Sequence, residues 1–161
     1  MDGHKIALAL RAAYLSTHRK ADAALMASGI TCNQFVVLSA LDQEDGISQR
    51  LLVERIASDP NTIRPILSAL EEKGLVSRKP SSKDGRVWEV KLTRKGRNAF
   101  AKANAKTADF RHRLTAPLTK AEAKTLVELL QKITESVNLP EPVPKRIKAK
   151  RKTAVTSNGS L

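Results

Sequence analysis

The chain has 161 residues, with 29 lysines and arginines against 16 aspartates and glutamates, so its formal net charge is +13 at neutral pH. This length suits one compact domain, or a small domain with an added assembly element. The single cysteine excludes an internally disulfide-bonded scaffold, and one cysteine with three scattered histidines is too few for a structural zinc site. No apolar run approaches the roughly 18 to 20 residues of a membrane span, and the short run 6–10 lacks the basic start of a signal peptide, so we expect a cytoplasmic protein without membrane contact.

The first two predicted elements are helices. Between residues 4 and 28, apolar and small side chains recur with a period near 3.6, and Gly29 follows as a helix-ending glycine. The segment Thr31-Cys32-Asn33-Gln34 matches a capping box, so a second helix is expected to begin there. The expected buried face of this second helix consists of Phe35, Leu38 and Leu41.

A third helix is predicted after Ser48, and a fourth from residue 62 to residue 73, with the turn 58–61 between them. Pro65 lies in the fourth helix, where an interior proline costs about 3 kcal/mol. The prediction therefore requires a helix that starts near Asn61, so that Pro65 stays in or just past the first turn. Two helices joined by such a short turn form a helix-turn-helix.

The first turn of the fourth helix carries the candidate base-reading residues Asn61, Thr62 and Arg64. The N-terminus of a helix can enter the major groove of DNA, where Asn and Arg can pair bidentately with adenine and guanine. The alternative is a capped surface helix with ordinary polar residues, and this segment alone leaves both interpretations open.

A hairpin is predicted next, from a short strand at 75–79, a polar turn at 80–85 and a second strand at 86–92. In the second strand Trp88, Val90 and Leu92 alternate with polar residues with a period of two, which is typical of a β-strand. A hairpin directly after a helix-turn-helix is typical of a winged helix.

The tip of this hairpin is basic, with Lys79, Lys83 and Arg86 around the turn. Such a tip suits phosphates or a narrow minor groove, and we expect Asp84 to hold the Arg86 guanidinium by a charge-assisted bond. The alternative is a solvated turn, which is the usual role of a Ser-Ser-Lys-Asp-Gly segment.

The last predicted elements are a helix at about 94–114, capped by Thr93 and ended by Pro117, and a final helix after the capping box Thr119-Lys120-Ala121-Glu122. The final helix carries an apolar stripe that needs a partner surface. From residue 139 onward the chain has no apolar period, and its segment 145–152 contributes six of the positive charges, which leaves +7 on the rest. We expect this basic tail to be disordered.

Taken together, residues 30–97 resemble the winged helix-turn-helix of the MarR family of bacterial transcription regulators. The segments that carry this resemblance are Thr31–Leu41, Ile47–Ile56, Asp59–Ile63, Leu70–Arg78, Asp84–Arg86 and Val90–Arg97. The resemblance implies that Asn61, Thr62 and Arg64 lie on a recognition helix and Arg86 at the tip of a wing. It also implies a small effector ligand that relieves DNA binding. Pro65 stands where many members carry a polar or basic residue, and Arg64 is the candidate to take over that base contact.

The resemblance further implies that the two chain ends build a dimerisation domain. The fold expected is mainly α-helical with a small β-hairpin wing, and a winged helix-turn-helix core is flanked by terminal dimerisation helices. The expected divisions are an N-terminal dimerisation helix at 1–29, the DNA-binding domain at 30–97, C-terminal dimerisation helices at 98–138 and the basic tail at 139–161. The expected dimerisation residues are Ile6, Leu10, Leu126, Leu129, Leu130, Ile133 and Val137. Burial of this stripe within one chain is the alternative.

Other residues carry weaker signals. Cys32 begins a helix, which can lower a thiol pKa and make a redox sensor, but a small buried apolar role is the favoured interpretation. His18 and His112 can approach each other across a dimer domain to bind a metal or ligand, although ordinary solvated histidines are favoured. No catalytic triad, carboxylate pair, phosphate loop or zinc motif is present in the sequence, so we expect neither an enzyme nor a cofactor.

Two functions remain from the sequence. The first is a homodimeric regulator, expected to be a repressor, that binds double-stranded DNA at an inverted-repeat operator. The second is a winged-helix interaction module that meets protein or RNA through its basic surface. The polar first turn of the fourth helix favours the first, because a protein-binding module more often exposes an apolar patch there.

Overall fold

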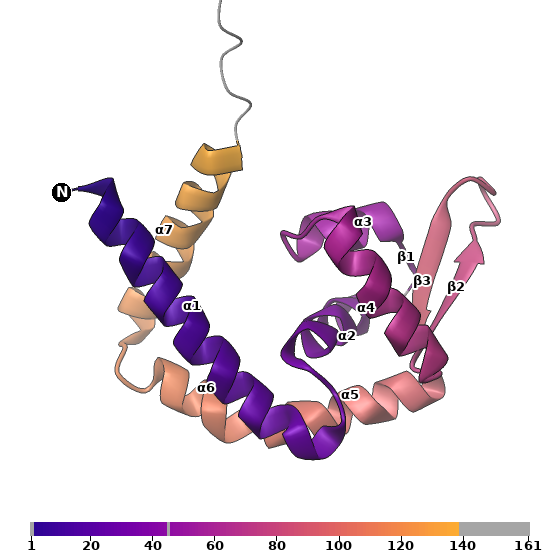
Figure 1. Ribbon diagram of the computed structural model, residues 1–161, viewed down its shortest axis with the longest axis horizontal. Helices are drawn as coiled ribbons and strands as arrows, with labels where there is room; N and C mark the ends of the chain where they lie inside the picture. The colour runs from indigo at the N-terminus through magenta and orange to yellow at the C-terminus, as the bar shows by residue number, and fades with distance from the viewer. Residues whose placement is uncertain (1, 45, 139–161) are drawn as a thin grey trace, which may run out of the picture. The chain divides into compact units, whose positions relative to one another are not determined.

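The computed structural model describes residues 2–44 and 46–138, and the predicted basic tail lies outside these residues. In chain order the elements are α1 (Gly3–Leu25), the 3-10 turn η1 (Met26–Ser28), α2 (Cys32–Gln43), β1 (Ile47–Ser48), α3 (Gln49–Arg55), α4 (Pro60–Glu72), β2 (Val76–Pro80), β3 (Trp88–Leu92), α5 (Arg94–Lys106), α6 (Ala108–Thr115) and α7 (Lys120–Asn138) (Figure 1). The described residues divide into two compact units, with the boundary between residues 119 and 120.

The predicted fold class, mainly helical with a small β wing, is confirmed. The sheet contains one strand more than expected, because Ile47–Ser48 forms β1 and gives the antiparallel order β1-β3-β2. In this sheet Ile47 lies opposite Val90, and Val76 lies opposite Leu92. A strand of two residues is too short to show a period of two in the sequence, which is why it was not predicted.

The start of α2 is built as predicted. The Thr31 hydroxyl oxygen accepts a hydrogen bond from the Gln34 amide, and the Gln34 side chain accepts one from the Thr31 amide. A third residue joins from α1, where the Asp22 carboxylate accepts a hydrogen bond from the Cys32 amide at 2.7 Å. These contacts fix the angle between α1 and α2.

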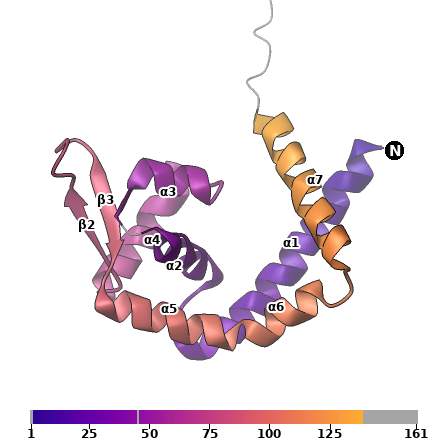
Figure 2. The same cartoon turned by 180° about the vertical axis from the view of Figure 1, so that it is seen from behind.

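The core of the winged domain lies between α2, α3, α4, the sheet and α5 (Figure 2). Its fully buried large side chains outside α1 are Leu38, Leu41, Leu52, Ile63, Leu67, Leu70, Val37 and Val90. Phe35 is half-buried and stacks on Phe100 of α5, with ring centroids 5.4 Å apart. The apolar face predicted for α2 is therefore confirmed for Leu38 and Leu41 and only partial for Phe35.

Gly96 explains how α5 approaches the sheet. A Cβ at this position would lie 1.9 Å from the Leu75 carbonyl oxygen, so only a glycine lets the two backbones come this close. Thr93 caps the helix by accepting a hydrogen bond from the Gly96 amide, while its hydroxyl donates to the Gly74 carbonyl. The glycine inside the helix is therefore a packing requirement.

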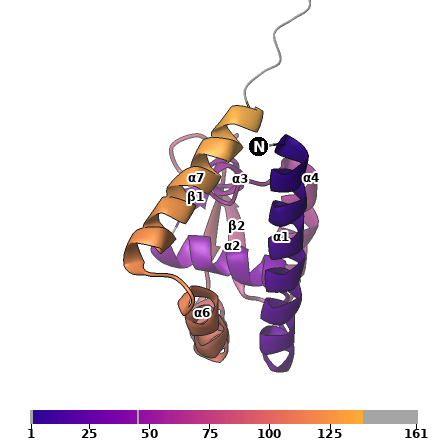
Figure 3. The same cartoon turned by 90° about the vertical axis from the view of Figure 1, so that its left-hand side faces the viewer.

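The prediction of one helix at 94–114 was wrong, because the chain breaks at Thr107 into α5 and α6. Thr107 is buried, and its hydroxyl donates to the Asn104 carbonyl and accepts a hydrogen bond from the Arg111 guanidinium. The side chain thus competes with regular helical geometry at this point. After the break, α6 packs against α1 (Figure 3).

Within the described residues no single helix is long and apolar enough to cross a membrane. One bent pair, Gly3–Ser28 with Cys32–Gln43 at 80° to each other, passes a test of length and composition. Val37, Leu38 and Leu41 of α2 are however buried in the winged core.

Candidate nucleic-acid interface

The N-terminus of α4 is held open to solvent by a strong cap. The Asp59 carboxylate accepts hydrogen bonds from the backbone amides of Asn61 and Thr62 and, at 2.6 Å, from the Thr62 hydroxyl. These bonds, the one from the Thr62 side chain first, lower the pKa of Asp59. The cap therefore stays ionised and fixes the backbone of the first turn.

The three predicted base-reading residues lie together on the exposed side of this turn. Asn61, Thr62 and Arg64 are exposed, whereas Ile63 between them is fully buried. The Thr62 hydroxyl already donates to Asp59, so this side chain offers a methyl group and an acceptor lone pair. Asn61 and Arg64 keep their full donor sets for an outside partner.

The helix begins at Pro60, two residues earlier than predicted, and Pro65 is its sixth residue. Pro60 occupies the first helical position, where a missing N–H has no intrahelical partner to lose. Pro65 lies just past the first turn, as the sequence argument required. It has no amide proton to donate to the Asn61 carbonyl, so this carbonyl lacks its usual helical donor.

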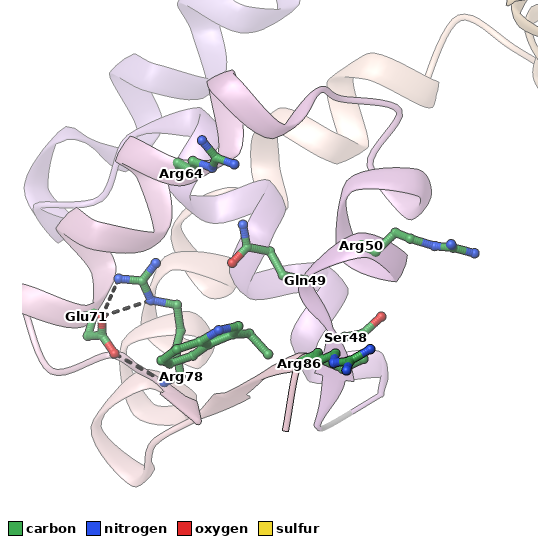
Figure 4. A pocket seen from close by; sticks show the side chains of 9 residues that line it. Ser48, Gln49, Arg50, Arg64, Glu71, Arg78 and Arg86 are labelled. Carbon is green, nitrogen blue, oxygen red and sulfur yellow. Dashed lines mark hydrogen bonds and ion pairs between the residues drawn. The ribbon is translucent and has the colours of Figure 1, made fainter. Parts of the chain in front are cut away.

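Beside this turn the surface is hollowed into a groove of about 1030 Å³. The groove is lined by the start of α3, by α4, by β2 and by the wing, and four arginines reach it: Arg50, Arg64, Arg78 and Arg86. Arg64 and Gln49 face the groove from α4 and α3, while Arg50 points away from them (Figure 4). Arg50 forms an ion pair with Glu54 at 3.2 Å.

Sequence reasoning missed the contribution of α3, namely Ser48, Gln49 and Arg50. The signal was present, because the helix predicted after Ser48 does begin there, and the Ser48 hydroxyl caps it by accepting a hydrogen bond from the Leu51 amide. The half-buried Gln49 and the exposed Arg50 then lie in its first turn. The groove is therefore formed by the starts of two helices and by the wing.

Arg78 is the arginine of this groove that connects two elements of the fold. Its Nε and Nη2 donate to Glu71 Oε2 at 2.9 and 2.5 Å, and its backbone amide donates to Glu71 Oε1 at 3.2 Å (Figure 4). The hydrogen bonds from Arg78 lower the pKa of Glu71. The pair connects α4 to β2, so its role is to join the helix to the wing.

The wing exposes its predicted basic residues Lys79, Lys83 and Arg86. The Asp84 carboxylate accepts a hydrogen bond from the backbone amide of Arg86 at 3.0 Å, and the Val87 amide donates to the Asp84 carbonyl. Asp84 thus stabilises the turn and does not hold the Arg86 guanidinium as we expected. The reason is local, because a carboxylate two residues before an amide closes a tight turn more readily than it reaches a long side chain.

Trp88 is half exposed and lines the groove. Val90 and Leu92 in the same strand are buried. Apolar and polar residues still alternate along β3. At Trp88, however, the hairpin extends beyond the core, so the indole is not covered by the core residues.

The residues with weaker signals are placed as follows. Burial, and then the nearby charge of Asp22, raise the pKa of the Cys32 thiol, which disfavours the reactive thiolate. His18 contacts the same carboxylate at 3.1 Å. In the part of the chain that the structure describes, no three His, Cys, Asp or Glu side chains are grouped so as to hold a metal ion.

A family model for MarR matches residues 30–88, which cover the helix-turn-helix and most of the wing. The HTH-type transcriptional repressor Rv2887 of Mycobacterium tuberculosis is 32% identical over 111 residues, which are 69% of this chain and 80% of that protein. The chain belongs to the MarR family. MarR-family proteins are transcription regulators and not enzymes.

Solved MarR-family structures share this fold. A mutant of MarR from E. coli, crystallised with operator DNA, is 28% identical with a TM-score of 0.73, over 84% of this chain and 94% of that one. The PcaV regulator from Streptomyces coelicolor, in complex with its natural ligand, is 26% identical with a TM-score of 0.67, over 84% of this chain and 92% of that one.

Proposed function

We propose that this MarR-family regulator is a homodimeric repressor that binds an inverted-repeat operator in double-stranded DNA. The observation that carries the proposal is the exposed first turn of α4, with Asn61, Thr62 and Arg64 beside a groove rich in arginines. The names of two similar proteins support it, since one is a repressor and the other was crystallised with its operator.

The chemistry of the groove fits duplex DNA. Arg64 can bind guanine bidentately and Asn61 can bind adenine, while the exposed wing residues Lys79, Lys83 and Arg86 can bind phosphates or the minor groove. Gln49 on α3 adds a further polar side chain that faces the groove. An interaction module for proteins would instead expose a large apolar patch on this face.

Dimerisation is supported by apolar residues that are exposed in the part of the chain that the structure describes. On α7, Leu126, Leu129 and Val137 are 45%, 53% and 74% exposed, and Ile6 on α1 is 39% exposed. An amphipathic helix that exposes its apolar stripe needs a partner, and a second copy supplies the same stripe. Two copies would present their recognition helices about 34 Å apart, one turn of DNA.

A small effector ligand that relieves DNA binding is the remaining part of the proposal. The complex of PcaV with its natural ligand supports it, and the ligand of the present protein is considered in the next subsection.

Arg64→Ala tests the function. The change should cost about 1 to 3 kcal/mol in binding to the cognate operator, taken from the intergenic DNA beside the gene, and should relax base preference at one position. Fluorescence anisotropy at fixed salt measures both. Arg19→Ala, at an exposed arginine of α1, is the matched control and should leave operator affinity unchanged. Equal losses on operator and random duplex would show that Arg64 touches only phosphate, and no preference for any duplex by the parent protein would refute the proposed function.

A further inference from the structure

A second groove, of about 950 Å³, lies away from the α4 start, between the loop that joins α1 to α2, the end of α4 and the face of α5. Its lining includes five cationic residues and no acidic one. These five residues are Lys73, Arg94, Lys95, Lys102 and Lys106.

Two of the five lysines and arginines are engaged in holding the fold. The Lys73 ammonium donates to the Gly29 carbonyl at 2.8 Å and to the Gln34 side chain at 3.1 Å. The Lys95 ammonium donates to the Lys73 carbonyl at 2.7 Å. Both therefore bind neutral oxygens, and their charge is not neutralised by an acid.

The other three cations form one stripe. Arg94, Lys102 and Lys106 are exposed, and within residues 2–44 and 46–138 none of them has an ion pair with an acidic side chain. Together with Asn98 they follow each other at intervals of four residues, so they lie along one face of α5. Twelve residues of helix span about 18 Å, which is too far for one phosphate to reach all three.

The floor of the groove is apolar. Ile30 and Leu75 line it and are each only 5% exposed, and the half-buried Ala99 lies beside them. A volume of this size is typical of sites for small organic ligands, which combine an apolar surface with a few polar groups. A nucleic-acid backbone needs the cations but not such a floor.

We propose that this groove binds a small organic anion that carries two or more phosphate groups, of the nucleoside diphosphate or triphosphate class. The phosphates lie along Arg94, Lys102 and Lys106, and the uncharged part of the ligand lies on Ile30 and Leu75. This proposal names the chemical class of the effector in the proposed function. Ligand binding itself does not depend on that function, but the expected effect on operator binding rests on it.

Lys73 couples the groove to the recognition helix. It is the C-cap residue of α4, and its ammonium holds the loop at Gly29, whose backbone is left-handed at φ 63°. A phosphate in the groove competes with the Gly29 carbonyl for this ammonium. Ligand binding therefore weakens the connection between α4 and the α1–α2 loop, and we expect it to weaken operator binding.

Calorimetric titration of the full chain with ATP, pyrophosphate and adenosine tests the site directly. ATP should bind saturably, pyrophosphate more weakly and adenosine below detection. The double variant Lys102→Ala and Lys106→Ala should lower ATP affinity by about tenfold or more, because two charge-assisted contacts are lost. The control pair Lys120→Ala and Lys132→Ala removes the same charge from exposed positions of α7 and should change ATP affinity by less than about twofold.

Three results would overturn the proposal: no saturable binding of ATP, equal affinity in the groove variant and the control, or equal affinity for ATP and adenosine. If the groove variant instead loses affinity for random duplex while ATP does not bind, the groove is a DNA surface. ATP binding by a protein that prefers no operator would support the site and count against only the repressor function.

Discussion

Gly96 is the residue at which a single methyl group has the largest predictable effect. An alanine there would place its Cβ against the Leu75 carbonyl, which is backbone and cannot turn away. We expect Gly96→Ala to lower the free energy of unfolding by about 3 kcal/mol, the upper end for overpacking, and urea denaturation measures it. Gly85→Ala is the control, because a Cβ at Gly85 meets nothing within 4 Å. Equal stability of the two variants would show that α5 can shift away from the sheet.

Some residues could be placed from the sequence and others could not, for physical reasons. The caps at Thr31, Ser48 and Asp59 follow from bonds between neighbours in the chain, and all three were predictable. The exposure of Trp88 depends on where the core ends, which no local pattern encodes. The four-residue spacing of the cations along α5 was visible in the sequence. That the loop between α1 and α2 lies opposite them could not be predicted, because it depends on tertiary packing.

At the scale of elements, Asp84 and Arg86 have different roles in the wing turn. Asp84 stabilises the turn through the Arg86 amide, and the Arg86 guanidinium is left for DNA. Arg86→Ala should weaken operator binding by about 1 to 3 kcal/mol, because a charged contact to DNA is lost. Asp84→Ala should weaken it less, since it loosens the turn through the Arg86 amide and leaves the guanidinium in place. Operator affinities of both variants, measured side by side, check the order. The opposite order would mean that the shape of the turn matters more than the charge.

The ion pair between α4 and β2 predicts a pH dependence of stability. The pKa of Glu71 is lowered in the folded protein, so the pair stabilises the fold above the ordinary pKa of glutamate, near 4.3, and this contribution is lost as the pH falls through the lowered value. Glu71→Gln should therefore cost about 1 kcal/mol or less at pH 7, since the pair is partly exposed, and progressively less as the pH falls through the lowered pKa.

Denaturation of both proteins at pH 7 and at lower pH values measures this difference. Glu54→Gln is the control, because its ion pair with Arg50 is far more exposed and should contribute less. A difference that grows toward low pH would contradict the assignment. The elements themselves were largely predictable, with two exceptions. β1 forms because it pairs with the distant β3, and the break at Thr107 comes from hydrogen bonds of one side chain that the apolar pattern does not reveal.

At the scale of the whole molecule, the exposed stripe of α7 predicts the oligomeric state. Leu130→Asp would place an unpaired charge in the proposed dimer seam, at a cost of several kcal/mol, and sedimentation equilibrium should then show a monomer. Gln131→Asp introduces the same charge one residue away, outside the stripe, and should leave the dimer intact. A Leu130→Asp protein that remains a dimer of unchanged affinity would show that the stripe packs elsewhere.

The contact between Glu71 and Arg78 affects how strongly the wing can bind DNA. Because it fastens β2 to α4, a recognition helix seated in the major groove brings the wing tip along at a fixed spacing. The second contact is then intramolecular and is governed by an effective concentration, which for short linkages is in the millimolar range. A wing that alone binds DNA too weakly to detect can therefore still lengthen the lifetime of the complex. Loss of the Glu71–Arg78 contact would shorten that lifetime, although every contact to DNA remained available.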